Sequence, residues 1–542
     1  MTINRFFPGM AVLLLALLRC AAAHAYDMPI GIPAPDFGSA LGNPINAPLP
    51  AHPAAWPTGE APGYYYIDNT AANATDSANP YGYPNRPRLT IPLSLPAGSV
   101  AEVRGGPYRF ARDANFTLNG NVTRPVYLYG VNHPVLQDPV KTLIHGAYFV
   151  FDGFTLRNTR IQTVDLKYAV IRNSEVAGNA ATTNGIQVSG SNIALYDNAI
   201  HHHQGDDMHG IVLTEGSHHV WILGNRLSYN GGDGIQFCHD CATSPPTHVY
   251  IGGNTIHGNR ENGIDLKYCS SVILSQNEVY NHWPTSPGVK FCYDDGSGCT
   301  TGSSGSDGVS ILAGSNGRPD HVWILFNHVH DSNKGIRVEE AYNSFVLGNV
   351  IHDVAAMGLE FGRTGEGPAI AAFNTIHNTA TGIKGPWEAG DLKITMEANI
   401  LSHISGDSID IDDAPAAQSS ASNNLFYNDG GAISVRWNSH ITTASGADID
   451  AIAGGSGNLI GDPMFRNPAA ADFHVLPGGA GIDQAPAVLA DLNTRFRSRF
   501  GGNVSILRDF SNTPRPLAGL DIGAYENHGV TGESPPAPPL LF

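Results

Sequence analysis

An asparagine beside an aliphatic residue recurs along the middle of the chain at nearly constant spacing. The asparagines stand at positions 173, 198, 225, 254, 277, 327, 349, 374, 399 and 424, and their spacings are 22 to 29 residues except for one step of 50. A second motif, Gly-apolar-x-apolar, interleaves with the first, as in GIQV at Gly185 and GIDL at Gly263. One such period cannot bury an apolar face by itself, so its copies must stack against one another.

Each period contains three short runs of alternating apolar and polar residues, which predicts three β-strands. When coils stack about 4.8 Å apart, their strands pair in parallel and enclose one continuous core. We therefore predict an all-β chain, folded as a single-stranded right-handed parallel β-helix with ten or more coils of about 25 residues and three short strands per coil. Asparagine suits one corner, because it tolerates the left-handed conformation and can hydrogen-bond to the asparagine of the next coil.

The two ends of the chain differ from the repeat. Residues 1–25 contain a basic residue, a short apolar stretch and a small-residue Ala-His-Ala sequence, which together predict a secretory signal peptide. We expect residues 26–62, rich in Pro and Ala, to be a linker, residues 63–530 to form the β-helix domain with opening and closing segments, and residues 531–542 to be a flexible tail. The protein is then expected to be secreted or periplasmic, monomeric and without a membrane span.

The charge balance excludes one class of partner. The chain has 30 Lys and Arg against 48 Asp and Glu, a net charge of −18, which becomes −20 without the first 25 residues. Because non-specific nucleic-acid binding needs a basic surface, we expect no nucleic-acid partner. An acidic polysaccharide would also be repelled, unless bound cations or local Lys and Arg residues reverse the sign near the site.

The cysteines of an exported protein are expected to form disulfides. Cys292 and Cys299 would close a small loop. Cys269 has two candidate partners, Cys238 and Cys241, and either choice leaves one thiol over.

Several segments resemble the pectate-lyase-like superfamily of exported bacterial parallel β-helix proteins. These are the opening segment at residues 63–110, the closing segments at 457–483 and 515–526, and the motif NGIDLK, which ends at Lys267. The motif is similar to that of polysaccharide lyases whose catalytic base is a lysine. The resemblance covers nearly the whole chain after residue 25, and it implies that the Gly-apolar-x-apolar strands form the substrate cleft.

Counting along those strands predicts which side chains share a column. Positions +1 and +3 after the glycine point inward, so positions +2 and +4 point outward. The +2 column is predicted to contain Gln187, Val212, Gln236, Asp265, Ser310, Arg337, Glu360 and Lys384. The +4 column is predicted to contain Ser189, Thr214, Cys238, Lys267, Leu312, Glu339 and Gly362. The −1 column is predicted to contain Asn184, His209, Asp233, Asn262, Asp307 and Lys334. Two long insertions, after Cys238 and at residues 284–306, border the middle coils, where we place the site.

The main hypothesis is a lyase that cleaves a uronate-containing polysaccharide by β-elimination. The proton next to a uronate carboxylate becomes removable when the charge of that carboxylate is neutralised, and Ca²⁺ or a basic side chain does this. We predict Lys267, Asp233 and Arg337 as catalytic residues. Since Ca²⁺ prefers six to eight oxygen ligands, we predict it at Asp206, Asp207, Asp233, Asn262 and Asp307, where it would lower the pKa of Lys267. Substrate contacts are predicted at Gln236, Asp265, Glu339, Glu360 and Lys384.

Three alternatives remain open. The pair in QGDDMHG, with a third acid, suggests an inverting glycoside hydrolase that uses Asp206, Asp207 and Asp233, although the flanking motifs of polygalacturonases are missing. A uronate epimerase would use similar groups, but the Asp-Pro-His-Asp signature of alginate epimerases is absent. A non-catalytic glycan-binding or surface β-helix is the third alternative, in which the outward charges serve solubility and form ion pairs.

Overall fold

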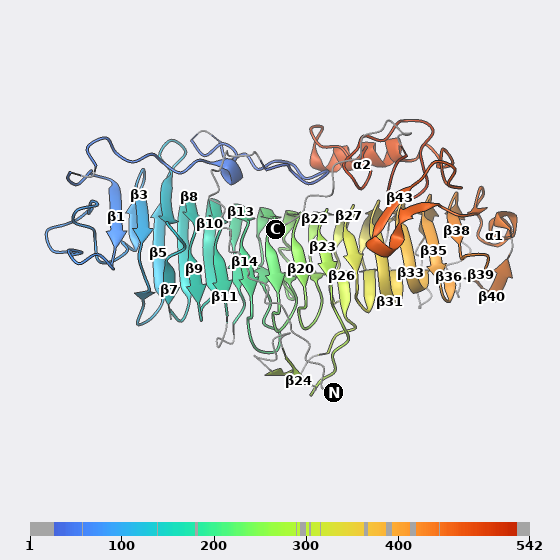
Figure 1. Ribbon diagram of the computed structural model, residues 1–542, viewed down its shortest axis with the longest axis horizontal. Helices are drawn as coiled ribbons and strands as arrows, with labels where there is room; N and C mark the ends of the chain where they lie inside the picture. Colours follow the sequence, from blue (N-terminus) through green and yellow to red (C-terminus); the bar gives the residue numbers. More distant parts are fainter. Residues whose placement is uncertain are drawn as a thin grey trace, which may run out of the picture.

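Three rows of parallel strands wind along one long axis and form the body of the protein (Figure 1). The computed structural model describes residues 26–38, 40–56, 58–137, 139–178, 183–288, 290–292, 300–302, 305–314, 316–362, 367–385, 393–411, 419–438, 440–443 and 445–527. The predicted signal peptide, the predicted tail and Cys299 lie outside the described residues. We call the rows face 1, face 2 and face 3, in the order in which each coil visits them.

Face 1 contains the Gly-apolar-x-apolar strands. It consists of β2 (Ser94–Pro96), β5 (Ala114–Asn119), β12 (Ile186–Val188), β15 (Ile211–Leu213), β18 (Ile235–Phe237), β21 (Ile264–Leu266), β26 (Val309–Ala313), β29 (Lys334–Val338), β36 (Asp407–Ile411) and β39 (Ile433–Trp437). One inward position is aliphatic in coil after coil and fully buried, at Ile186, Ile211, Ile235, Ile264 and Ile336.

Face 2 lies between face 1 and the asparagine corner. It consists of β1 (Tyr64–Asp68), β3 (Val100–Arg104), β6 (Val126–Gly130), β13 (Gly190–Tyr196), β16 (His218–Leu223), β19 (Thr247–Gly252), β22 (Ser270–Ser275), β27 (Asp320–Leu325), β30 (Tyr342–Leu347), β32 (Ala369–Ala372), β34 (Ile394–Glu397) and β37 (Ser420–Ser422).

Face 3 follows the asparagines. It consists of β4 (Tyr108–Arg109), β7 (Val135–Gln137), β9 (Thr155–Arg157), β11 (Glu175–Ala177), β14 (Ala199–His201), β17 (Arg226–Ser228), β20 (Thr255–His257), β23 (Glu278–Tyr280), β28 (His328–His330), β35 (Ile400–Ile404), β38 (Leu425–Tyr427) and β41 (Leu459–Ile460). Four long strands cross between faces: β8 (Thr142–Asp152) and β10 (Ile161–Arg172) from face 1 to face 2, and β31 (Val350–Phe361) and β33 (Thr375–Lys384) from face 3 to face 1. The predicted all-β parallel β-helix, with coils stacked in register, is confirmed.

The asparagines form a buried ladder of hydrogen bonds from Asn198 to Asn458. In each step the Nδ2 group donates to Oδ1 of the next asparagine at 2.8–3.1 Å, and the backbone N–H donates to the same oxygen. The expected left-handed conformation falls on the preceding residue instead, often a glycine such as Gly224 or Gly253. At the start, Ser174 takes the position expected for Asn173, and its N–H donates to Asn198.

The segment predicted as a linker is instead largely docked. Residues 26–38 and 40–47 form a strap along face 2, seen as the dark blue chain above the helix in Figure 1. The Ile30 N–H donates to Gln276, and the Trp221 indole donates to the carbonyl of Pro33 at 2.7 Å. The Arg172 guanidinium donates to the carbonyls of Pro44, Ile45 and Ala47, next to a 3₁₀ turn at Pro44–Asn46. Apolar strap residues also pack on the face, so this segment belongs to the domain.

The C-terminal part packs against the outside of the β-helix, on faces 2 and 3. Helix α2 (Leu489–Phe500) packs on face 2, where the ring centroids of Phe496 and Trp323 lie 5.0 Å apart. The hairpin of β42 (Phe465–Asn467) and β43 (Asp472–Val475), with its 3₁₀ turn Pro468–Ala470, packs on face 3 through Phe473. Helix α1 (Gly446–Ile452) and strand β40 (His440–Thr443) lie at the far end of the β-helix. No helix within the described ranges is long and apolar enough to cross a membrane.

The 50-residue step shifts the register of one coil. It contains the insertion that includes the short hairpin of β24 (Lys290–Phe291) and β25 (Thr300–Thr301). After it, Leu312 lies opposite Asp265 and Arg337, in the position predicted for Ser310. Ser310 is fully buried and donates to Ser332. Counting from Gly308 is therefore wrong by two residues, because Ser310 occupies the place that glycine has in the other coils.

The ladder predicts a stability effect. Replacing Asn254 by Ala removes its donation to Asn277 and to the carbonyl of Ile222, and leaves the Asn225 donors without their acceptor. Because these groups are buried, the free energy of unfolding should fall by about 2–3 kcal/mol. Chemical denaturation measures it, with the exposed Asn115→Ala on β5 as the control. An equal effect of both substitutions would contradict the ladder's role.

Candidate active site

A buried polar cluster lies on face 1, where three successive coils place their polar side chains together. The coil that leads into β15 supplies His209, the coil of β18 supplies Asp233, and the coil of β21 supplies Glu261, Asp265 and Lys267. Asp265 on β21 and Lys267 directly after it are two positions apart, so both point away from the apolar core. All five are less than one-tenth exposed.

The centre of this cluster is an ion pair between Asp265 on β21 and Lys267 directly after that strand. Lys267 Nζ lies 2.9 Å from Asp265 Oδ2, and both side chains are more than nine-tenths buried. The other carboxylate oxygen, Asp265 Oδ1, is buried and accepts no hydrogen bond within the described part of the chain. Burial, and next the charge of Asp233, raise the pKa of Asp265 to about 7 in spite of Lys267. Burial opposes the charged form of Lys267, but Asp265, Asp233 and Glu261 outweigh it and raise the lysine pKa.

Asp233 stays ionised in the same surroundings. Its Oδ1 accepts hydrogen bonds from the backbone and side-chain amides of Asn262, both at 2.9 Å, and its Oδ2 accepts one from Gln236. The backbone N–H of Asp233 donates to Nδ1 of His209 at 2.8 Å, and the same Nδ1 lies 3.3 Å from Asp233 Oδ2. Burial alone would raise the pKa of Asp233, but the contacts with His209 and Lys267 lower it. Two neighbouring carboxyls therefore have pKa values shifted in opposite directions, which is typical of acid–base sites.

The loops around the cluster form its walls. Asn262 Oδ1 accepts hydrogen bonds from Ser306 and from the N–H of Val309, which ties the insertion to the cluster. A cavity of about 390 Å³ lies there, and its lining includes Asn262, Asp307 and Arg337. On another side, Gly317 approaches the backbone of Lys267 so closely that a Cβ would lie 2.3 Å from it.

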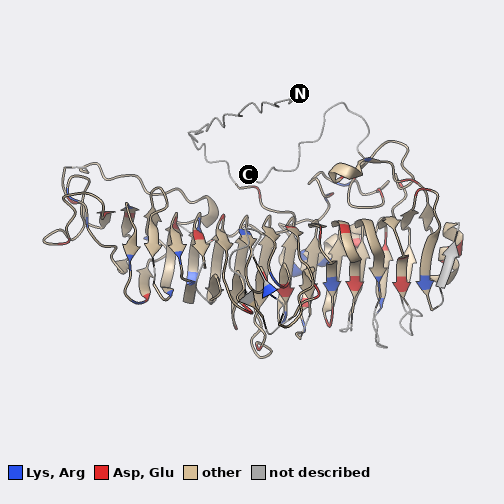
Figure 2. Ribbon diagram, turned by 60° about the horizontal axis from the view of Figure 1, so that its bottom comes forward, with Lys and Arg blue, Asp and Glu red and all other residues tan. Residues whose placement is uncertain are grey.

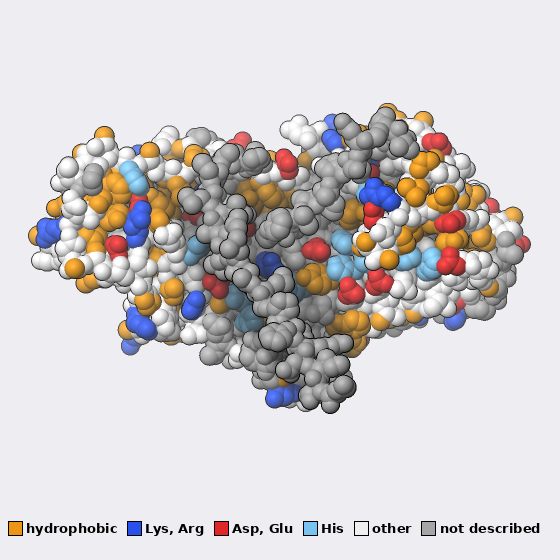
Figure 3. Space-filling model, viewed as in Figure 1, with side chains coloured by type: hydrophobic (Ala, Val, Ile, Leu, Met, Phe, Trp, Pro, Cys, Tyr) orange, Lys and Arg blue, Asp and Glu red, His pale blue; other side chains and the backbone are white. Residues whose placement is uncertain are grey.

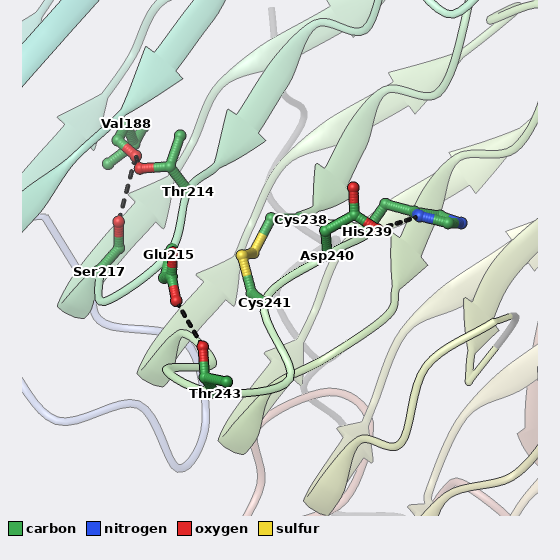
Figure 4. Close-up of a disulfide and its surroundings, with 9 residues drawn as sticks. All are labelled: Val188, Thr214, Glu215, Ser217, Cys238, His239, Asp240, Cys241 and Thr243. Atoms are coloured by element: carbon green, nitrogen blue, oxygen red, sulfur yellow. Dashed lines mark hydrogen bonds and ion pairs between the residues drawn. A yellow bond between two sulfur atoms is a disulfide. The ribbon is translucent and has the colours of Figure 1, made fainter.

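The cysteine predictions need correction. Cys238 pairs with Cys241 and closes the turn after β18 (Figure 4), while Cys269 is a buried free thiol. The turn is also tied to the neighbouring coil, since Thr243 donates to Glu215. The predicted Cys292–Cys299 pair includes a residue outside the described part of the chain.

The five predicted calcium ligands do not converge. Asp206 is bound by the buried Arg260 at 2.8 Å, and Asp207 is exposed. Asp307 contacts Lys334 and Arg337 at 3.0 and 3.1 Å, so it does not flank Lys267. Asp233 Oδ1 already accepts from the two amides of Asn262, and Asn262 Oδ1 already accepts from Ser306 and Val309. These residues do not form the predicted oxygen cradle for Ca²⁺, and we derive no step from it.

The remaining predicted residues form a charge ladder on face 1. Register pairs place Arg337, Glu360, Lys384, Asp410 and Arg436 in one column, with the alternation of sign that Figure 2 shows. Ion pairs join neighbours at 3.5 Å for Arg337–Glu360 and 3.4 Å for Lys384–Asp410, and Arg337 also pairs with Glu339 at 2.9 Å. These contacts stabilise coil stacking. Arg337 lies two coils from Asp265 in the same column.

Sequence reasoning missed three members of this region. His209 was placed in a column without a role, and Glu261 and Arg260 were not singled out. One ligand atom from each of His209, Asp233 and Glu261 lies within 4.8 Å of the others. The available signal was the column itself, because His209 and Asp233 occupy equivalent positions before successive glycines.

Comparison with known proteins agrees with this architecture. A family model described as a right handed beta helix region matches residues 148–298. The chain contains a right-handed β-helix. This right-handed β-helix has no match among curated protein sequences.

Solved structures with similar coordinates include several β-helix enzymes. Pectate lyase Pel9A is 14% identical, with 85% of this chain and 96% of that chain covered and a TM-score of 0.43. A mannuronic acid specific polysaccharide family 6 lyase from human gut microbiota is 12% identical, with coverage of 62% and 81% and a TM-score of 0.41. The periplasmic alginate epimerase AlgG is 11% identical, with coverage of 63% and 78% and a TM-score of 0.36. At these scores the matches carry no argument about the reaction.

The buried histidine predicts a pH-dependent stability. Burial lowers the pKa of His209, but Asp233, with Glu261 and Asp207, outweighs burial and raises the pKa above 6.5. The folded state therefore holds this proton more tightly than the unfolded chain. The stabilisation is complete below about pH 6.5 and is lost as the pH rises through the raised folded-state value.

We expect the stability difference between the wild type and His209→Gln to shrink as the pH rises from about 6 to about 9. Denaturation at several pH values measures it, with His239→Gln in the exposed turn as the control. A difference that stays constant across this range would contradict the charged His209–Asp233 contact.

Proposed function

We propose that this protein is an exported carbohydrate-active enzyme, a polysaccharide lyase that cleaves a uronate-containing glycan by β-elimination with Lys267 as the base. The observation that supports this most is the buried Asp265–Lys267 pair, beside a second carboxylate and a cavity that contains Arg337. Burying two charges is costly and contributes little stability, so such a pair favours a chemical role, and Asn262, which donates to the neighbouring Asp233, lines the cavity.

The pair offers a route for the proton that needs no external acid. The raised pKa of Lys267 means that the resting site holds an ammonium group. Asp265, with a pKa of about 7, accepts that proton across 2.9 Å, which leaves a neutral amine and no change in net charge. The amine then takes the substrate proton next to the carboxylate, a double bond forms, and protonated Asp265 donates to the leaving oxygen. After these two transfers the site again holds the Lys267 ammonium and the Asp265 carboxylate, which is the resting pair.

The acidic charge of the protein does not exclude an acidic substrate at this place. Arg337 lines the cavity, and Lys334 pairs with Asp307, which lines it as well. Asp307, which pairs with both, is more than half exposed, so an incoming carboxylate has access to the same cations. Calcium remains a prediction, and the assay with EDTA tests it.

One observation favours a second candidate function. The opposite pKa shifts of Asp233 and Asp265 also suit an inverting glycoside hydrolase, with protonated Asp265 as the acid and Asp233 as the base. This pair replaces the predicted set of Asp206, Asp207 and Asp233, because Asp206 is bound to Arg260 and Asp207 is exposed. A hydrolase releases reducing ends without forming a double bond.

The test is an incubation with pectate, alginate and glycosaminoglycans, with Ca²⁺ or with EDTA, followed by ultraviolet absorbance of unsaturated uronates. Lys267→Ala should lower the rate about 100-fold or more, as loss of a general base does. The matched control is Lys167→Ala, an exposed lysine on β10. Absorbance that rises at the wild-type rate in Lys267→Ala would contradict the base assignment, and reducing ends without absorbance would favour the hydrolase.

A further inference from the structure

Face 3 contains a second group of chemically competent side chains, well separated in the fold from the cluster on face 1. Glu278 comes from β23, His328 and His330 from β28, and His352 from β31. Three successive coils therefore contribute to one group. Figure 3 shows histidines gathered beside acidic side chains on the face that Figure 1 presents.

The strand register explains why these four side chains meet. Glu278 lies opposite His328, and His330 lies opposite His352. Since His328 and His330 are two residues apart on one strand, both point to the same side. The four groups occupy the corners of a small parallelogram on the outer surface of the sheet.

The distances within the group suit a shared ion. His328 Nε2 lies 2.8 Å from His352 Nε2, and His330 Nε2 lies 3.7 Å from Glu278 Oε1. One ligand atom from each of Glu278, His328 and His330 lies within 4.8 Å of the others.

A second, independent feature orients two of the rings. Nδ1 of His330 lies 2.8 Å from Asp331 Oδ2, and Nδ1 of His352 lies 2.7 Å from Asp353 Oδ2. A carboxylate that accepts the Nδ1–H proton fixes the tautomer and leaves the Nε2 lone pair available. This arrangement is the one that commonly supports histidine ligands of metals.

We propose that Glu278, His328 and His330 bind one divalent transition-metal ion of the zinc class, with His352 Nε2 within 2.8 Å of His328 Nε2 at the edge of the site. The donor set of two imidazoles and one carboxylate is suited to such ions and unsuited to Ca²⁺, which prefers oxygen. A metal held from the coils of β23 and β28 would cross-link them.

The competing explanation is a purely structural stack of rings. Tyr280, His330 and His352 do stack along face 3, with interplanar angles of 8° and 9°. A stack alone does not account for His328, whose Nε2 points across the stack at His352, nor for the two carboxylates behind the rings. Another histidine stack, His219 on His248 with an interplanar angle of 2°, lies on face 2 and provides a matched control.

The test measures zinc itself. The whole protein is stripped with EDTA, dialysed and titrated with Zn²⁺ by calorimetry, and its thermal unfolding is followed with and without Zn²⁺. We expect one Zn²⁺ per chain and a higher unfolding midpoint. His328→Ala should lose both effects, Glu278→Gln should weaken binding about tenfold or more, and His219→Ala should match the wild type.

Each outcome decides the proposal. Because His328 is largely buried, circular dichroism checks that the His328→Ala variant is folded. Glu278 is more exposed, so Glu278→Gln tests the site without leaving a cavity in the protein. Failure of the wild type to bind Zn²⁺ would overturn the assignment. Binding by His328→Ala and Glu278→Gln as tight as that of the wild type would overturn it as well. The result is independent of the reaction on face 1, since no residue is shared.

Discussion

The pairing of each coil with the next is the interaction on which the rest of the structure depends. Parallel backbone hydrogen bonds hold the coils together, and the asparagine ladder adds a buried side-chain bond at the same corner of nearly every coil. A slip of one residue would break this ladder and move apolar side chains outward, so the register is strongly specified. Every column of side chains on the outer surface follows from it.

The candidate site is a consequence of that register. His209, Asp233, Asp265 and Lys267 are distant in sequence by up to 58 positions, yet successive coils bring them into contact. The insertion is tied to Asn262 beside these side chains, and their burial strengthens the coupling between the charges. The same register creates the histidine group on face 3 and the charge ladder beyond Arg337. A β-helix thus offers many columns, of which only a few combine opposite charges with burial.

The repeat allowed much of the fold to be predicted, because its period, its strands and its asparagines are all visible in the sequence. It also placed Asp265 and Lys267 on one outward face, which the contacts support. Ser310 and Leu312 were misplaced, because an insertion can change which residue begins a strand and nothing local marks the change. The strap was taken for a linker, since its Pro and Ala content hides scattered anchors such as Ile30 and Phe37. Arg260 was missed because its partner, Asp206, is 54 positions away.

The central claim is that the buried pair breaks the glycan without adding water across the bond. The most direct measurement is to cleave an active uronate substrate in water enriched in heavy oxygen and to weigh the products by mass spectrometry. The account predicts products without heavy oxygen, each pair containing one unsaturated end. Incorporation of heavy oxygen at the newly formed ends would contradict the elimination mechanism and assign Asp233 and Asp265 to hydrolysis.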